Sequence, residues 1–274
     1  MGFNLDTQAT RSDLMSVDST LSENITAAQD YIPVASTTNF STSVVAEIET
    51  TNEVVSFTDI SSNLISYSEQ FDNAAWIKSN LTISADSTTA PDGTTTADSW
   101  LSTATSSCYI SRDASGTGGD TYTFSIFAKA GDMNWFRISN VSSGASGGWF
   151  NLTDGTLGTS NGVGNVSTIT SVGDGWYRCE RKFASYVTGG TSVIYAPSSA
   201  DGATTAPGSN KFIYFWGAQV EKASSASTYL PTTSSALVGL TNVTRGVNGT
   251  TAATASSGDA IQQLPYALGE VNMP

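Results

Sequence analysis

Short apolar runs alternate with turn residues along most of the chain, and this pattern leaves little room for any fold other than a mainly β one. Runs at 121–128, 175–179 and 211–216 are rich in β-branched and aromatic residues, and glycine-containing turns separate them. Charged residues make up only 13% of the 274 residues, so the polar positions fall largely to Ser, Thr, Gly and Asn. Strands at this density predict antiparallel sheets, arranged as a β-sandwich or jelly roll.

The run at 212–221 has the clearest alternation of side chains. Successive side chains of a strand point to opposite faces, so we expect one face of this run to pack into a core. The residues expected on the core face are Phe212, Tyr214, Trp216, Ala218 and Val220. The opposite face begins apolar and ends polar, with Gln219 and Glu221 expected near solvent.

One segment near the start of the chain has a different period. Between residues 12 and 30 the apolar side chains fall three or four positions apart, at Leu14, Val17, Leu21, Ile25 and Ala28. This spacing predicts one amphipathic N-terminal helix. Two interpretations stay open for it: packing against the first β-domain, or the seam of a short trimeric coiled coil.

Two stretches far apart in the sequence share a second pattern of short runs rich in β-branched residues. A β-hairpin is expected at 43–60, with its turn at Thr51-Asn52, and similar β-branched residues return at 237–243. The pair Asn248-Gly249 is a strong tight-turn signal, because both residues tolerate positive φ. We therefore expect the two ends of the chain to contribute to one β-rich domain.

Seven blocks of the middle region resemble, in order, the concanavalin-like jelly-roll module that is frequent in phage tail and structural proteins. The blocks lie at 63–72, 75–76, 90–93 with 97–98, 122–125 with 128–131, 175–179, 216–221 and 229–233. Such modules are similar to carbohydrate-binding modules. The resemblance therefore implies an antiparallel jelly-roll β-sandwich over residues 63–235 and a surface that contacts glycans.

The flanks, when spliced together, resemble a small β-module common in phage fibre, baseplate and capsid-associated proteins. The matching residues are 53–60 joined to 240–253. The family pattern often has a histidine shortly after the Ala252-Ala253 pair, and its absence here argues against a metal role. The resemblance implies a discontinuous virion-anchoring β-domain of residues 1–62 plus 236–274, with the jelly roll inserted at a loop.

Together, the resemblances imply a non-enzymatic structural protein of a bacteriophage virion. We expect an external capsid decoration or a tail or neck appendage, assembled in the host cytoplasm and located on the virion surface. Its partners would be other capsid, neck or tail proteins, and its jelly roll would project outward to contact host surface polysaccharide. The alternatives are a dedicated polysaccharide adhesin of a tail fibre and a depolymerase.

Charge and composition argue against several other classes. The net charge of −13 repels phosphate backbones, so no nucleic acid is expected as a partner. Residues 1–62 carry a net −8 and residues 63–235 a net −4, which suggests two units of different origin. The sequence contains no histidine, the commonest catalytic base. No apolar run is long enough to predict a membrane span.

The six tryptophans of the middle region are candidates for stacking on sugar rings. Trp176 and Trp216 lie in regular strand patterns and are assigned to packing. Trp135 and Trp149 flank a Gly- and Ser-rich loop at 142–148, so we predict them as glycan-binding residues. Burial of both rings in the core is the alternative.

The scattered carboxylates support no catalytic prediction, because the sequence brings no two of them to a defined separation. No cofactor is expected. The glycines near Asp92, Asp120 and Asp174 leave a structural calcium site as an alternative to plain turns. We interpret Cys108 and Cys179 as small buried residues, with a disulfide as the alternative.

Assembly is expected to involve the split domain. Arg245 lies in a strongly acidic region, so it should be paired, either with turn carbonyls or in a salt bridge across a subunit boundary. The apolar stripe of Leu14, Val17, Leu21 and Ile25 offers a second contact. These residues predict an interface that forms a symmetric homo-oligomer, a homotrimer.

Overall fold

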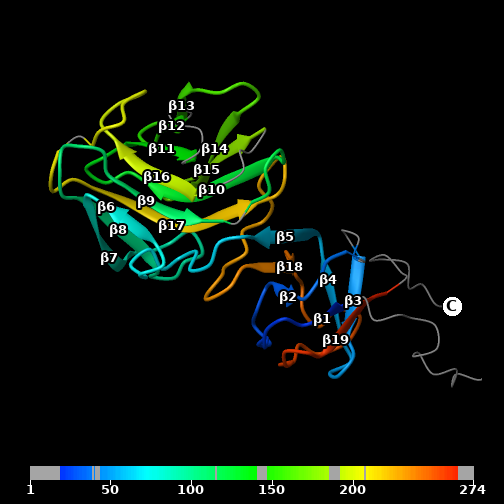
Figure 1. Cartoon of the computed structure of the whole chain (residues 1–274). Helices are drawn as coiled ribbons and strands as arrows, with labels where there is room; N and C mark the ends of the chain where they lie inside the picture. Colours follow the sequence, from blue (N-terminus) through cyan, green and yellow to red (C-terminus); the bar gives the residue numbers. More distant parts are fainter. Residues whose placement is uncertain are drawn as a thin grey trace, which may run out of the picture. The chain divides into compact units, whose positions relative to one another are not determined.

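The computed structural model of this chain describes residues 19–38, 40, 44–114, 116–140, 147–184, 192–206 and 208–264. The described residues form β-strands, turns and loops, and contain no helix. The chain divides into two compact units (Figure 1). Unit 1 comprises Met1–Ser61 and Leu237–Pro274, and unit 2 comprises Ser62–Ala236, so unit 2 is an insertion into unit 1. Each boundary lies one residue from the position expected from the sequence.

Unit 1 contains two small sheets. The first has the strand order β1 (Ser19–Thr20), β19 (Ala260–Gln263), β3 (Val44–Ile48), β4 (Glu53–Phe57). The second has the order β2 (Ile32–Val34), β18 (Leu237–Thr241), β5 (Asp59–Asn63). β3 and β4 form the expected antiparallel hairpin, and its turn includes Asn52 with a φ of 51°. Asn248 and Gly249 also have positive φ, as the tight-turn prediction requires.

The chain leaves and re-enters unit 1 through neighbouring strands. β5 and β18 are adjacent in the three-stranded sheet, and the buried hydroxyls of Ser61 and Thr241 lie 2.7 Å apart in a hydrogen bond. The ends of the inserted segment are therefore held together by unit 1. A folded insertion whose ends lie close together adds little loop-closure entropy to the host domain.

Unit 2 contains two six-stranded sheets, and every neighbouring pair of strands in them is antiparallel. The sheet that we call the β10 sheet has the order β14 (Val166–Gly173), β15 (Trp176–Phe183), β10 (Tyr122–Lys129), β17 (Phe212–Glu221), β8 (Ala97–Ser102), β7 (Leu81–Thr88). The β11 sheet has the order β13 (Thr156–Ser160), β12 (Gly147–Asn151), β11 (Trp135–Asn140), β16 (Ser192–Ser198), β9 (Tyr109–Asp113), β6 (Ile77–Ser79).

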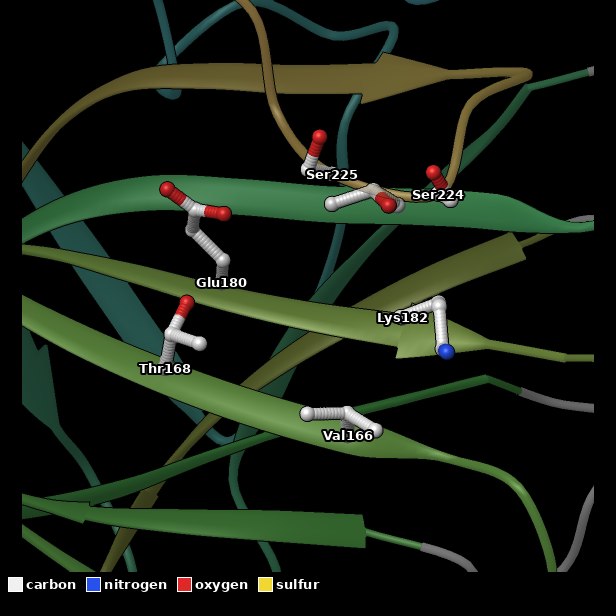
Figure 2. Close-up of a pocket in the computed structure, with 7 residues that line it drawn as sticks. Val166, Thr168, Glu180, Lys182, Ser224 and Ser225 are labelled. Carbon is white, nitrogen blue, oxygen red and sulfur yellow. The ribbon is translucent and has the colours of Figure 1, made fainter.

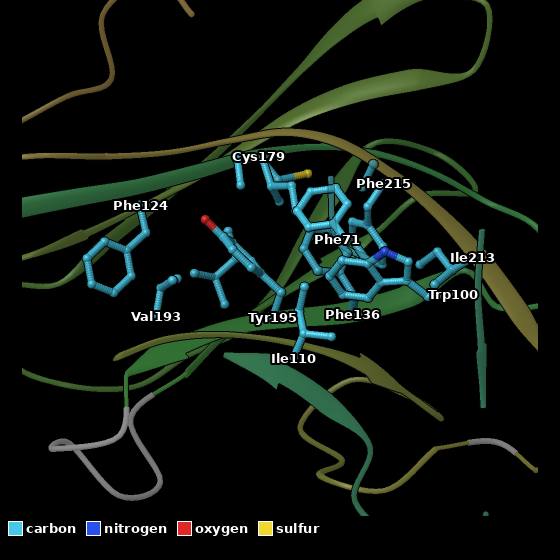
Figure 3. Packing of buried hydrophobic residues seen from close by; sticks show 14 of the residues in the cluster. Phe71, Trp100, Ile110, Phe124, Phe136, Cys179, Val193, Tyr195, Ile213 and Phe215 are labelled. Atoms are coloured by element: carbon cyan, nitrogen blue, oxygen red, sulfur yellow. The ribbon is translucent and has the colours of Figure 1, made fainter. Parts of the chain in front are cut away.

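One hydrophobic core lies between these two sheets (Figure 3). The ring of Phe136 from β11 packs edge-on against that of Phe215 from β17, with centroids 5.1 Å apart. The hydroxyl of Tyr195 in β16 donates to the backbone carbonyl of Ser125 in β10 at 2.9 Å, so a buried hydrogen bond also joins the sheets. Cys108 and Cys179 are both buried and free, as the first of the two interpretations expects. Unit 2 is therefore β-sandwich-like.

Strand β17 does not follow the predicted alternation. Tyr214 and Trp216 belong to a separate aromatic cluster, in which Trp216 packs on Phe127 of β10. A β-bulge at Gly217, whose φ is 60°, then exchanges the two faces of the strand. The residues of β17 that enter the core are Ile213, Phe215, Ala218 and Val220. Strict alternation was wrong for the first half of the strand because it ignores this extra residue. The expectation that Gln219 and Glu221 lie near solvent is also wrong, because both side chains are buried.

The predicted N-terminal helix is wrong over residues 19–30, the part of it that the structure describes. Ser19–Thr20 forms β1, which pairs with β19. Leu21 and Ile25 form isolated antiparallel bridges, and the amide of Ile25 donates to the carbonyl of Ala255 at 2.9 Å. Ser, Thr and Asn are weak helix formers, so these long-range backbone hydrogen bonds prevail over the local period.

Candidate functional site

Three side chains of β11 point away from the core of unit 2. Phe136 and Ile138 are fully buried in that core, so Trp135, Arg137 and Ser139 lie on the opposite face of the strand. We call this face the outer β11 face. Trp135 and Arg137 are half-buried on it, whereas Ser139 is buried.

Trp149 packs on this face but is not open to a ligand. It pairs with Arg137 across β11 and β12, and only 2% of its surface is exposed. Its indole N–H donates to the carbonyl of Ala203 at 2.7 Å, and the guanidinium of Arg137 lies 5.9 Å from the centre of its rings. The prediction that the Trp149 ring stacks on a sugar is therefore wrong. The ring is covered by Arg137 and by the loop that contains Ala203.

Trp135 keeps a partly exposed ring. A Cβ placed on Gly158 would lie 2.6 Å from the Trp135 ring and closer still to Oδ1 of Asp201, so this glycine makes room for both side chains. Asp201 accepts hydrogen bonds from the backbone N–H of Thr159 at 2.6 Å and from its hydroxyl at 3.1 Å. Both oxygens of the Asp201 carboxylate therefore accept hydrogen bonds from Thr159. Trp135 remains a candidate for ligand contact.

Arg137 is the residue that the sequence interpretation overlooked. Its guanidinium makes no hydrogen bond or ion pair with the residues that the structure describes, and its Nε is buried without a partner among them. The buried Oγ of Ser139, two positions along the same face, also lacks a hydrogen bond to any described residue. Burial lowers the pKa of Arg137. The available signal was a single cation two positions after Trp135 in an alternating run.

A shallow groove lies on the outer face of the other sheet (Figure 2). Glu180 and Lys182 of β15 lie beside Val166 and Thr168 of β14, and a loop closes the groove from the opposite side. The lining residues are Thr123, Val166, Thr168, Glu180, Lys182, Ser224 and Ser225. Glu180 accepts a long hydrogen bond of 3.4 Å from the amide of Ala226 in that loop. This groove carries both charge signs, and its lining includes no aromatic side chain.

Three carboxylates of unit 2 are engaged inside the fold. Asp98 accepts from the backbone amides of Phe71 and Asp86, and burial raises its pKa to about 7. Glu69 accepts from the Tyr229 hydroxyl, and burial raises its pKa to about 6. Glu221 accepts from the amide and hydroxyl of Ser227, and burial raises its pKa. Each is held by donors of the protein itself, which is the arrangement of structural carboxylates.

The aspartates considered for calcium have local contacts in the fold. Asp92 accepts hydrogen bonds from the amide and hydroxyl of Thr94, as in an Asx turn. Asp120 forms a surface ion pair of 2.7 Å with Lys222. Asp174 has a φ of 51° in the turn before β15. Within the described part of the chain, no three His, Cys, Asp or Glu side chains are grouped so that they could hold a metal ion.

Arg245 is paired inside its own chain. Its Nε and one terminal nitrogen each lie 2.7 Å from an oxygen of Glu53, a residue with no exposed surface. It also donates to the carbonyls of Thr26 at 2.6 Å and Ala253 at 2.7 Å. The expectation that Arg245 is paired is confirmed. Of the two partners considered from the sequence, the structure shows the contact with backbone carbonyls. The salt bridge of Arg245 is formed with Glu53 of the same chain, within unit 1.

Two residues of the apolar stripe predicted as an oligomer interface pack inside unit 1 instead. Leu21 is 1% exposed and Ile25 is 2% exposed, and both belong to the hydrophobic core of unit 1. They are therefore not available to a second subunit, which corrects their assignment as interface residues. Leu14 and Val17, the other two members of the stripe, lie outside the described residues.

Comparisons with known proteins do not assign this chain to a family. Neither a family model nor a curated protein matches its sequence. Among the residues that the structure describes, no helix is long and apolar enough to cross a membrane.

Proposed function

We propose that this chain is a non-enzymatic structural protein of a bacteriophage virion. In this proposal the split unit 1 anchors the protein to the capsid, neck or tail, and unit 2 projects outward and contacts host glycans. The ordered resemblance of residues 63–235 to the concanavalin-like module suggests the phage context. The insertion of a complete β-sandwich-like unit through adjacent strands supports a division between anchoring and binding.

The finer topology that we propose for unit 2 is a jelly roll. Its sheets are antiparallel, and many neighbours within them are far apart in sequence, such as β10 beside β17 and β16 beside β9. Such long-range pairings are typical of Greek-key and jelly-roll connections. The arrangement leaves each sheet with one outer face that a ligand could cover.

The single observation that carries the binding role is the outer β11 face. It presents a partly exposed Trp135 beside the cation of Arg137, which has no acceptor among the described residues. Aromatic rings and a few polar groups are the usual components of a saccharide surface. The engaged carboxylates of unit 2 support a role without catalysis.

Mass spectrometry of purified virions tests the structural role. We expect peptides from both units in intact particles, at a stoichiometry that matches a symmetric part of the virion. Glycan arrays probed with the full-length protein then test the contact with host sugars. Absence of the protein from purified particles would overturn the virion assignment, whereas uniformly negative arrays would reduce unit 2 to a spacer.

A further inference from the structure

Arg137 differs from other arginines of unit 2 in having no acceptor among the described residues. Arg181 is fully buried, and it donates to the hydroxyls of Ser160 and Ser167 at 2.9 Å and to the carbonyl of Asn161. Arg112 donates to a backbone carbonyl at 2.6 Å and to a serine hydroxyl. Withdrawal of a cation from water costs free energy unless hydrogen bonds replace those to water. For Arg137 the described fold provides the contact with the Trp149 ring but no hydrogen-bond acceptor, and its terminal nitrogens are not among the buried atoms.

The strand neighbours of Arg137 are neutral, and the Asp201 carboxylate beside Trp135 accepts hydrogen bonds from Thr159. Arg137 lies between Trp149 and Ala196 in the sheet, and Ser139 lies between Gly147 and Ile194. None of these neighbours offers a side-chain acceptor. Arg137 and Ser139 are two positions apart on the same face of β11, so their Cα atoms are about 7 Å apart by the repeat of an extended strand. The Nε of Arg137 and the Oγ of Ser139 are themselves buried, so the donors that a ligand can reach on this face are the terminal nitrogens of Arg137, which have no acceptor among the described residues.

Trp135 lies two positions from Arg137 in the other direction. Its ring is half-buried, and its indole N–H makes no hydrogen bond with the described residues. An aromatic side chain and a guanidinium on neighbouring positions of one strand face match a ligand with an apolar ring face at one end and a negative group at the other. A pyranose ring that carries an acidic substituent has this form.

We propose that the outer β11 face recognises a carboxylate-bearing sugar, with Arg137 binding the carboxylate and Trp135 stacking on the pyranose ring. Guanidinium presents a planar fork that matches a carboxylate in two parallel hydrogen bonds. A single cation suits a singly charged group, and the strand neighbours provide no second cation for a doubly charged phosphomonoester. This inference rests on the proposed glycan contact and names its substrate class.

Binding of oligogalacturonate to the full-length protein tests the inference. The matched ligand is the methyl-esterified oligomer, which keeps the ring and removes the charge, and a glycerol-phosphate polymer represents the phosphate alternative. We expect binding to the free acid only, with about a 10-fold or greater loss in Arg137→Gln. Arg137→Lys should lose affinity as well, because an ammonium lacks the planar fork. The exposed Lys211→Gln serves as the matched control and should bind normally.

Thermal unfolding of the same variants separates binding from packing. Arg137→Gln removes the contact with the Trp149 ring but breaks no hydrogen bond with the described residues, so it should lower the melting temperature only slightly. A large drop would indicate a structural role and overturn the inference. A loss of binding in Lys182→Gln in place of Arg137→Gln would move the site to the groove of Figure 2 and overturn it too.

The ligand series also distinguishes this inference from the broader proposal. Equal binding of the free acid and its ester would overturn the recognition of a carboxylate while leaving glycan contact intact. Binding to the glycerol-phosphate polymer alone would have the same consequence. If arrays of neutral and acidic glycans both gave no binding, the proposed glycan contact itself would fail, and the inference with it.

Discussion

Glu53 and Arg245 show how unit 1 accommodates a buried charge. Both oxygens of Glu53 bind Arg245 at 2.7 Å, and the amides of Gly246 and Ala253 donate to the same carboxylate at 3.0 and 3.1 Å. Burial alone would raise the pKa of Glu53, but these hydrogen bonds and the charge of Arg245 outweigh it and lower the pKa. The pair fixes the segment after β18 against β4.

The Glu53→Gln substitution should destabilise the protein. It leaves the Arg245 guanidinium buried beside a neutral amide, and removal of one partner from a buried pair costs about 3 kcal/mol or more. Urea unfolding monitored by circular dichroism measures the loss. Glu49→Gln, which changes an exposed carboxylate in the turn directly after β3, is the control and should change stability by less than about 0.5 kcal/mol. Equal effects of the two substitutions would contradict the role of the pair.

Asp98 should make unit 2 less stable as the pH rises. Burial raises its pKa from the ordinary 3.8 to about 7, so the folded state holds the proton more tightly than the unfolded state does. The resulting stability is fully present below about pH 4 and is lost as the pH rises through about 7. We expect Asp98→Asn to flatten the pH dependence of thermal unfolding in this interval. A dependence that is unchanged by the substitution would show that other groups control it.

Among the strands, local pairings are predicted from the sequence better than long-range ones. The hairpin of β3 and β4 and the turn at Asn248 depend on neighbouring residues, and both expectations are confirmed. The segment around Ile25 was predicted as a helix because its period is local, whereas its actual partner is Ala255 at the other end of the chain. No local pattern encodes that pairing.

The candidate site was predicted in part for the same reason. Trp135 and Trp149 were both predicted as glycan-binding residues because they flank a Gly- and Ser-rich loop, but the burial of Trp149 depends on the loop at Ala203, which lies far away in the sequence. Arg137 became visible as a candidate only when its surroundings were known, because the lack of an acceptor is a property of the packed sheet. Sequence alone assigns residue types to a face but not their hydrogen-bond partners.

The bulge in β17 depends on a glycine. Gly217 has a φ of 60°, and an added Cβ would lie 3.0 Å from the Phe127 ring and 3.2 Å from the Tyr229 ring. Gly217→Ala should therefore cost backbone strain plus crowding, about 2 kcal/mol in all. Gly119→Ala is the matched control, because Gly119 also has a positive φ of 87° but meets nothing within 4 Å. Chemical unfolding of both variants should show a clearly larger loss for Gly217→Ala.

For the complete chain, we still expect a symmetric homotrimer formed by unit 1. A split domain with two small sheets and a strongly acidic composition should gain stability from neighbours. Because Leu21 and Ile25 are used in its own core, the contact must involve other residues. Multi-angle light scattering of the full-length protein measures the mass. A monomer in solution together with single copies on the virion would contradict the trimer.

The two units should also respond to pH in opposite directions. In unit 1 the lowered pKa of Glu53 gives stability that is present above its ordinary value of 4.5 and is lost as the pH falls through its folded value. In unit 2 the raised pKa values of Asp98, about 7, and Glu69, about 6, give stability that is lost as the pH rises through this range. Each unit has its own hydrophobic core, so each should unfold as a separate cooperative transition.

Differential scanning calorimetry of the full-length chain at about pH 8, pH 5 and pH 3.5 tests this prediction. We expect two transitions. The transition of unit 2 should move to higher temperature between pH 8 and pH 5, because Asp98 and Glu69 bind protons more readily in the folded state. The transition of unit 1 should move to lower temperature between pH 5 and pH 3.5, and Glu53→Gln should remove most of that shift and so identify the transition. One merged transition at all three pH values would mean that the units unfold together, and it would contradict the independence that the insertion implies.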